Sequence, residues 1–256
     1  ACQTYWTVES AIDFLKERDT ERPFYLNVSF VDPHDPYDPP ARFLERIDES
    51  RIPRPLATED AAHLKATARF NDLGFKKSFE HYSIEDYVDL RRHYMASVAF
   101  IDQEVGRLLT FLDENGLMES VNVIFTADHG DMLGDFGFPT KGAWHFDACV
   151  RVPCIATGPG ITAQKCSDMV SNLDLFPTIL DLQEVSSDVP VEGRSLVPLL
   201  HGTGTLDRPD AALVESYGSY GNEDRELRAR SVRTPEAALT LFGDGPGMLF
   251  DLTDDP

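Results

Sequence analysis

The sequence is poor in positive charge: 23 lysine and arginine residues face 44 aspartate and glutamate residues, a formal net charge of −21. Such a chain repels phosphate backbones and anionic lipid headgroups, which excludes nucleic acid and an anionic membrane as main partners. Only 6 of the basic residues are lysine. An acidic, lysine-poor surface is typical of a salty cytoplasm, where ions screen repulsion. Loss of stability on removal of salt would support this hypothesis, and indifference to salt would reject it.

Long hydrophobic runs are missing as well. No apolar stretch approaches the roughly 20 residues of a membrane span, and no basic segment precedes an apolar one as in a secretory signal. Because the chain opens at Ala1 rather than at methionine, both a cytoplasmic and a periplasmic or secreted location stay open. The four cysteines show no C-x-x-C pair and no zinc-finger spacing, and are expected to be small buried side chains.

What is present is the pattern of an α/β protein. Hydrophobic residues make up 42% of the chain, enough for a globular core. Apolar periodicity predicts helices over residues 8–18 and 83–114, and apolar or β-branched runs predict strands over 24–31, 121–126 and 152–156. Further short strands are expected at 212–215, 229–233, 238–242 and 248–252. The fold class is therefore α/β, a mostly parallel sheet flanked by helices with a small antiparallel region at the C-terminus.

Acidic, imidazole and ammonium groups gather in the loop that follows the strand at 121–126. Ligands of α/β sheets bind at the carboxyl ends of strands, where Asp128 and His129 are expected. Singly, Asp128 would cap a helix, Lys141 would be a solvated lysine and His145 a structural histidine. Read together, a carboxylate and an imidazole suit a divalent metal, and a nearby cation suits an anion bound to it. This combination points to hydrolysis of a charged ester.

A second histidine, His34, follows the other early strand and is framed by Pro33 and Pro36. Alone it reads as an ordinary histidine in a turn. Its place at a second strand end, where rigid prolines fix the direction of a side chain, makes it a candidate general acid.

Six segments in order along the chain resemble the sulfatase family of the alkaline phosphatase superfamily. They lie at residues 30–37, 94–106, 125–134, 151–153, 193–200 and 249–256. The resemblance implies an alkaline phosphatase-like fold. It also implies that residues 1–205 are the later part of the catalytic α/β domain, with a surface excursion at 41–87, and that 206–256 begin a smaller α+β region.

Carried over by position, Asp128 and His129 match the metal-ligand pair of the family, in the form typical of its choline-sulfatase, iduronate-sulfatase and phosphonate-hydrolase branches. Lys141 matches the lysine that holds a sulfate oxygen and the leaving oxygen. His34 matches the histidine that protonates the leaving group. His145 lies where some relatives place a further polar, substrate-contacting residue. The implied metal is Ca²⁺, with Mn²⁺ and Mg²⁺ left open by the imidazole ligand.

The chain departs from the family in its nucleophile. Sulfatases oxidise the cysteine of a C-x-[P/S/A]-x-R motif to formylglycine, and none of the four cysteines here fits that motif. The family's early paired acids are missing too. We therefore expect this chain to be the later part of a longer enzyme, with formylglycine upstream, and we expect the isolated chain to be inactive.

The resulting hypothesis is a fragment of a sulfuric ester hydrolase that acts on a small-molecule or saccharide sulfate ester. A phosphodiester or phosphonate monoester hydrolase of the same superfamily is the first alternative. A non-catalytic binding relative that never had a nucleophile is the second.

Overall fold

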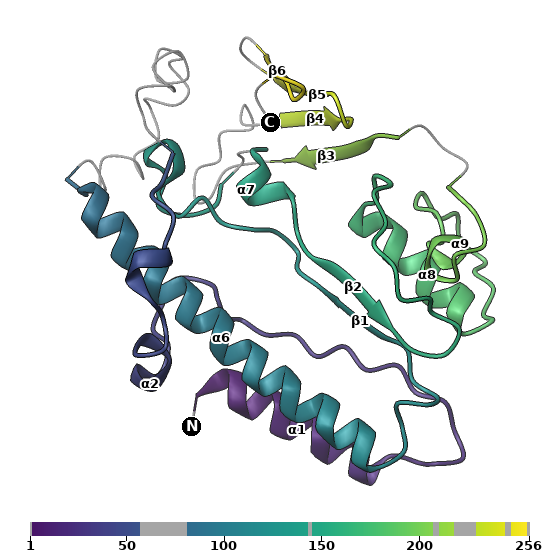
Figure 1. The fold of residues 1–256 in the computed structure, drawn as a ribbon. Helices are drawn as coiled ribbons and strands as arrows, with labels where there is room; N and C mark the ends of the chain where they lie inside the picture. Colours follow the sequence, from purple (N-terminus) through teal and green to yellow (C-terminus); the bar gives the residue numbers. More distant parts are fainter. Residues whose placement is uncertain are drawn as a thin grey trace. The chain divides into compact units, whose positions relative to one another are not determined.

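The computed structural model describes residues 2–56, 81–142, 145–206, 210–217, 229–243 and 247–254 (Figure 1). The chain divides into two compact units. The first comprises Ala1–Glu119 and Met132–Thr140, and the second comprises Ser120–Asp131 and Lys141–Pro256. In the described residues, no helix has the length and apolar character needed to cross a membrane.

The first unit is organised by the long helix α6, Ile84–Glu114. A capping box begins it: the Ser83 hydroxyl accepts from the amide of Asp86 at 3.2 Å, and the Asp86 carboxylate accepts from the Ser83 amide at 2.7 Å. It ends at Glu114, and its C-cap Asn115 is followed by Gly116 with a φ of 68°, a conformation that glycine adopts freely. The helix predicted over 83–114 is confirmed.

Helix α1, Gln3–Glu17, contacts α6 through one apolar face (Figure 1). Val8, Ile12 and Leu15, the apolar residues whose spacing predicts a helix over residues 8–18, are all buried. Helical spacing places them on one stripe, so burying that stripe against α6 stabilises both helices. The predicted helix is confirmed and begins earlier than expected.

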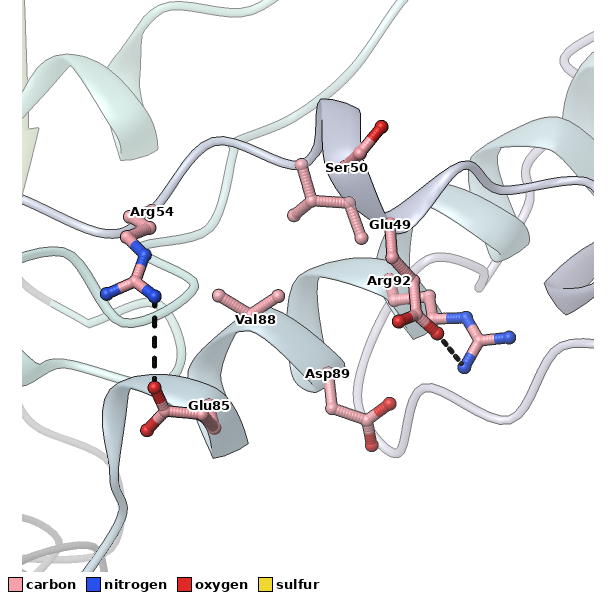
Figure 2. Close-up of a pocket in the computed structure, with 8 residues that line it drawn as sticks. Glu49, Ser50, Arg54, Glu85, Val88, Asp89 and Arg92 are labelled. Carbon is pink, nitrogen blue, oxygen red and sulfur yellow. Dashed lines mark ion pairs between the residues drawn. The ribbon is translucent and has the colours of Figure 1, made fainter.

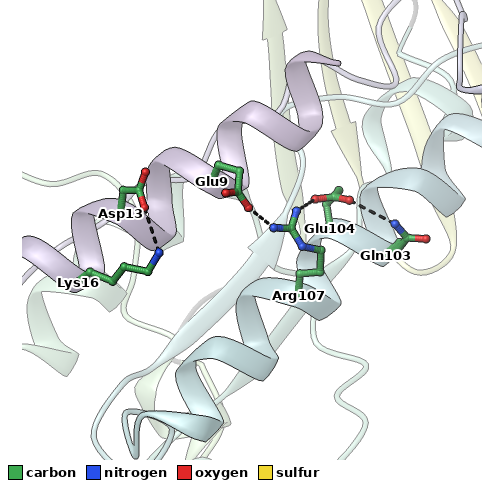
Figure 3. Close-up of polar contacts among 6 residues, drawn as sticks. All are labelled: Glu9, Asp13, Lys16, Gln103, Glu104 and Arg107. Carbon is green, nitrogen blue, oxygen red and sulfur yellow. Dashed lines mark hydrogen bonds and ion pairs between the residues drawn. The ribbon is translucent and has the colours of Figure 1, made fainter. Parts of the chain in front are cut away.

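The α1–α6 interface also contains a charged cluster (Figure 3). Arg107 of α6 donates to Glu104 on its own helix and to Glu9 of α1, while Gln103 Nε2 donates to Glu104 Oε1 at 3.3 Å. Glu104 is 1% exposed, so these partners supply the hydrogen bonds that its buried carboxylate needs.

Two short helices follow the irregular early segment: α2, Ala41–Leu44, and the 3₁₀ helix η1, Glu49–Arg51. Phe43 of α2 is fully buried, and its ring lies 5.0 Å from that of Phe100 on α6. Short helices were expected in the excursion at 41–87, and residues 57–80 of that excursion lie outside the described residues.

The strand predicted at residues 24–31 is not formed in the described part of the chain, where this segment is irregular. The prediction was wrong because a strand exists only through hydrogen bonds to a neighbour. No described segment supplies that ladder to residues 24–31.

The described residues of the second unit form two sheets. Strands β1, Val123–Thr126, and β2, Cys154–Thr157, pair antiparallel, with Val123 opposite Thr157. The other sheet is an antiparallel meander of β3, Ala212–Ser216, β4, Ala229–Arg233, β5, Ala237–Phe242, and β6, Met248–Asp251. The mixed α/β class and the antiparallel C-terminal region are as predicted. A mostly parallel sheet is not confirmed, because the described strands pair only in antiparallel fashion.

Short helices complete the second unit: α7, Asp147–Val150, η3, Asn172–Asp174, α8, Leu175–Leu182, and α9, Val197–Leu200. Asp174 is fully buried, and its carboxylate accepts from the amides of Ser171 at 2.8 Å and Arg194 at 2.9 Å. This buried acceptor joins the start of α8 to the segment that leads into α9.

Candidate active site

The loop after β1 is held in place by backbone contacts within the second unit. The carbonyl of Ala127 accepts from Asn172 Nδ2 at 3.0 Å, and the amide of Gly130 donates to the Cys149 carbonyl at 2.7 Å. A Cβ at Gly130 would lie 2.0 Å from the carbonyl oxygen of Ala148, so only glycine fits. The residues between these two points, Asp128 and His129, are thus fixed on both sides.

Asp128 and His129 present their side chains to one another. The Asp128 Oδ1 atom accepts from the His129 amide at 2.9 Å, and Asp128 Oδ2 lies 3.7 Å from His129 Nε2. His129 Nδ1 donates to the Gly130 carbonyl at 2.8 Å, so in the neutral ring Nε2 carries the lone pair. This is the arrangement of a metal-binding histidine whose other nitrogen is held by a carbonyl.

The separation of these two atoms is compatible with one shared cation. Two donors that each lie about 2.0–2.6 Å from a metal are about 3–4 Å apart. Both side chains reach solvent, with exposed fractions of 87% for Asp128 and 42% for His129. Within the described residues no third carboxylate, histidine or cysteine joins them, so the pair would form part of a coordination sphere.

Lys141 begins the return of the chain to the second unit and is half-buried. It thus belongs to the same unit as Asp128 and His129. Its contact with a substrate anion stays a prediction.

His145 has two protein partners. Its Nδ1 is 2.6 Å from the Ser231 hydroxyl and its Nε2 is 2.5 Å from the Ser216 hydroxyl. Burial lowers the pKa of His145 below its ordinary value. The ring joins the segment before α7 to strands β3 and β4, a relationship that its sequence position did not indicate. Its contact with substrate remains a prediction.

His34 lies in the first unit, between the cis peptides Asp32–Pro33 and Asp35–Pro36. Its Nδ1 donates to the Asp35 carbonyl at 2.7 Å and lies 3.4 Å from the Asp35 carboxylate. Thr4 of α1 donates to Asp32 and so holds the start of this loop. The Nε2 atom is the one left for a substrate, and it has a proton to donate when the ring is doubly protonated.

Three of the cysteines, Cys149, Cys154 and Cys166, do not have the environment of an activated nucleophile. Cys149 is buried, as expected from the sequence, whereas the expectation of burial was wrong for Cys2, Cys154 and Cys166, which are exposed. Burial raises the pKa of Cys154, and the hydrogen bond to Asp168 raises the pKa of Cys166. Since the thiolate is the reactive form, both effects oppose reactivity.

A pocket of about 380 Å³ lies elsewhere in the first unit (Figure 2). It is lined by Glu49, Ser50, Ile52, Arg54, Glu85, Val88, Asp89 and Arg92. Its two arginines are already paired, Arg92 with Glu49 at 2.7 Å and Arg54 with Glu85 at 3.8 Å. It contains none of the candidate residues and does not bear on the site.

Comparison with known proteins gives consistent matches. A family model described as Sulfatase matches residues 3–185, and one described as N-sulphoglucosamine sulphohydrolase, C-terminal, matches residues 134–256. An arylsulfatase of Clostridium perfringens is 32% identical over 99% of this chain and 52% of its own length. A choline-sulfatase of Rhizobium meliloti is 31% identical over 94% of this chain and 47% of its own length. The chain thus spans about half the length of these curated relatives.

Solved structures agree on the fold. A phosphonate monoester hydrolase of Agrobacterium radiobacter superposes with a TM-score of 0.87 at 25% identity, over all of this chain and 55% of that one. A protein crystallised with its substrate D-glucosamine-2-N,6-O-disulfate gives a TM-score of 0.78 at 23% identity, over 99% of this chain and 63% of that one.

Proposed function

This chain belongs to the sulfatase family, and on that premise we propose that it supplies part of the active site of a metal-dependent sulfuric ester hydrolase. The proposed substrate is a small-molecule or saccharide sulfate ester, in keeping with the sulfated saccharide bound by one structural neighbour. The observation that carries the proposal is the Asp128–His129 pair, whose Oδ2 and Nε2 atoms lie 3.7 Å apart.

We assign a divalent cation to Asp128 and His129. Carboxylate oxygen favours Ca²⁺, and the imidazole of His129 also suits Mn²⁺ or Mg²⁺. When bound, the cation would neutralise charge that develops on the transferring group. The Gly130 carbonyl has a supporting role, because it fixes the ring nitrogen that faces the ion.

Lys141 and His34 have complementary roles in this proposal. The Lys141 ammonium holds a sulfate oxygen and the leaving oxygen by charge. In its doubly protonated form His34 gives the Nε2 proton to the leaving oxygen and becomes a neutral ring, while Asp35 orients the ring through Nδ1. Without that proton, an alkoxide would have to leave, which is slow for an alkyl ester.

We assign the nucleophile to a part of the protein outside these residues, as a formylglycine. Two facts support this: no cysteine of the chain lies in C-x-[P/S/A]-x-R, and the chain spans about half of the length of its curated relatives.

A phosphonate monoester hydrolase is the second candidate. It is supported by the superposition on the Agrobacterium radiobacter enzyme, with a TM-score of 0.87, and by the Asp-His form of the metal pair. Both reactions use the same cation and lysine, so the geometry of this chain serves either.

The deciding experiment compares kcat/KM of the full-length protein on an aryl sulfate and on an aryl phosphonate, with and without a chelator. Faster turnover of the sulfate, lost in chelator and in Asp128→Asn, supports the proposal. Asp188→Asn, which alters an exposed aspartate, is the matched control. Faster turnover of the phosphonate favours the second candidate, and inactivity on both esters with metal present rejects catalysis.

A further inference from the structure

Helix α7 and the two residues before it, residues 145–150, contact the candidate metal pair through Gly130. We call these residues the α7 segment. The Gly130 amide donates to the Cys149 carbonyl at 2.7 Å, and a Cβ on Gly130 would lie 2.0 Å from the Ala148 carbonyl oxygen. The carbonyl of the same glycine accepts from His129 Nδ1 at 2.8 Å. Gly130 thus connects the α7 segment to the His129 ring, so a shift of α7 would move the nitrogen that faces a metal.

The residues that lead into α7 are bound by the four-stranded sheet of the same unit. The Ser231 hydroxyl lies 2.6 Å from His145 Nδ1, and the Ser216 hydroxyl lies 2.5 Å from His145 Nε2. The rings of Phe146 and Phe250 meet edge to face, with their centroids 6.1 Å apart. Two neighbouring side chains of the α7 segment therefore contact three strands, β3, β4 and β6.

An ion pair fixes the first residue of α7 to the same sheet. Arg233 Nη1 of β4 lies 2.6 Å from Asp147 Oδ1. The Arg233 side chain is only 21% exposed, so solvent screens this pair less than a fully exposed one. Arg151 is a weaker partner of Asp147, at 3.7 Å and with a side chain that is 75% exposed. Of these two arginines, Arg233 is the one that ties the α7 segment to the sheet.

The contacts of β4 with the α7 segment come from one face of the sheet. Ser231 and Arg233 are two residues apart on β4, and such side chains point to the same side of a strand. Thr240 of β5 lies opposite Ser231, and their hydroxyl oxygens are 2.6 Å apart. Both residues are buried. Buried polar groups tolerate displacement poorly, because a broken hydrogen bond leaves them unsatisfied, so this face holds the α7 segment in a defined position.

We propose that Arg233 is a positioning residue, which fixes the α7 segment through Asp147 and thereby orients His129 for the metal. The inference rests on the proposed function. Every contact that links Arg233 to His129 lies within the second unit, and Arg233 touches neither metal nor substrate in this account. The other end of the loop after β1 is held by Asn172 at the Ala127 carbonyl. Loss of Arg233 should therefore loosen the loop without releasing it.

The test uses the full-length protein and three variants: Arg233→Met, Arg233→Lys and Arg230→Met. Arg233→Met removes the charge that faces Asp147, whereas Arg233→Lys keeps it. Arg230→Met is the matched control, because Arg230 lies on the same strand but on its opposite face, and pairs with Glu215 of β3 at 2.8 Å instead of the α7 segment. Calorimetric affinities for Ca²⁺ and Mn²⁺, kcat and KM are measured below the melting temperature of every variant.

We expect Arg233→Met to weaken metal binding and lower kcat by about tenfold each, the low end of the effect of lost support around a metal site, because Arg233 acts through intervening backbone. KM should change less, since no substrate contact is lost. Arg233→Lys should recover part of both losses, and Arg230→Met should stay within about twofold of the wild type. Unchanged metal affinity and kcat in folded Arg233→Met would overturn the inference. Equal losses in Arg230→Met would also overturn it, because they would reflect the sheet as a whole.

Asp147→Asn tests the ion pair from its other end. It keeps the shape of the side chain and should weaken metal binding as much as Arg233→Met does. The double variant should lose no more than either single variant, since all three break one interaction. Additive losses would overturn the inference, because the two residues would then act separately. If Arg233→Met does not fold, the metal affinity and kcat of Asp147→Asn decide the inference by the same criteria.

The two proposals fail separately. A wild type that hydrolyses no sulfate ester rejects the proposed function, while the metal titrations still decide the role of Arg233. A wild type that binds neither Ca²⁺ nor Mn²⁺ overturns the inference, since there is then no site to position.

Discussion

The carboxylate of Glu104, although almost completely buried, is bound by the guanidinium of Arg107 one turn further along α6 (Figure 3). The same guanidinium donates to Glu9 of α1. One cation therefore compensates two carboxylates, and it links two helices that otherwise meet through apolar side chains.

Arg107→Met should destabilise the protein by about 3 kcal/mol or more, because it leaves Glu104 buried without a counter-charge. The matched control is Lys16→Met, since Lys16 pairs with Asp13 at 3.1 Å with both side chains more than half exposed. Its expected cost is about 0–1 kcal/mol. Unfolding in urea gives the free energy of unfolding of both variants. Equally small losses in Arg107→Met and Lys16→Met would show that water reaches Glu104.

The course of α6 could be predicted from the sequence, but its buried face could not. Apolar periodicity is a local signal, and it predicted the helix correctly. Val98 lies on the apolar stripe that predicted this helix and is nevertheless 44% exposed, whereas Arg91 and Glu104 are buried. The partners of Arg91 lie far along the chain, at Leu133, Pro53 and Asp135. Glu104 is bound by Arg107 of its own helix, and that arginine also reaches Glu9 of α1. Apolar periodicity along one helix indicates neither relationship.

The same distinction applies to the candidate site. Asp128 and His129 are neighbours in one loop, so their pairing could be anticipated. The contact of His145 with a substrate remains a prediction, and the sequence did not indicate that Ser231 and Ser216 lie at its two nitrogens. Both serines come from strands far along the chain. The irregular segment at 24–31 has a strand-like composition, but composition does not supply the ladder partner that a strand requires.

Two glycines should respond to alanine with opposite signs. In Gly130→Ala the new Cβ would meet the Ala148 carbonyl oxygen at 2.0 Å, so a loss of about 1–3 kcal/mol is expected. Gly106 lies inside α6 with nothing within 4 Å of its Cβ position, so Gly106→Ala should add about 0.5–1 kcal/mol. Thermal unfolding of the two variants measures both changes in stability. A stabilised Gly130→Ala would contradict the close packing of Gly130 against the Ala148 carbonyl oxygen.

His145 should make stability depend on pH. Because its pKa in the folded protein is below the ordinary value of 6.5, the unfolded chain takes up a proton first as the pH falls. The stability that neutral His145 contributes is complete above about pH 7.5 and is lost as the pH falls through and below 6.5. Melting temperatures measured from about pH 8 to about pH 5 should fall further for the wild type than for His145→Gln. Parallel pH profiles would show that the ring is not buried.

Metal binding by the chain of 256 residues alone should be weak, since the described residues bring only Asp128 and His129 together. Calorimetry should give a Ca²⁺ dissociation constant of about 1 mM or weaker, as for sites with few charged ligands. Asp128→Asn should abolish the remaining signal, because it removes the charged ligand, while Asp188→Asn should preserve it. Submicromolar Ca²⁺ binding would mean that further ligands of this chain complete the sphere, and the assignment of a partial site to Asp128 and His129 would then be wrong.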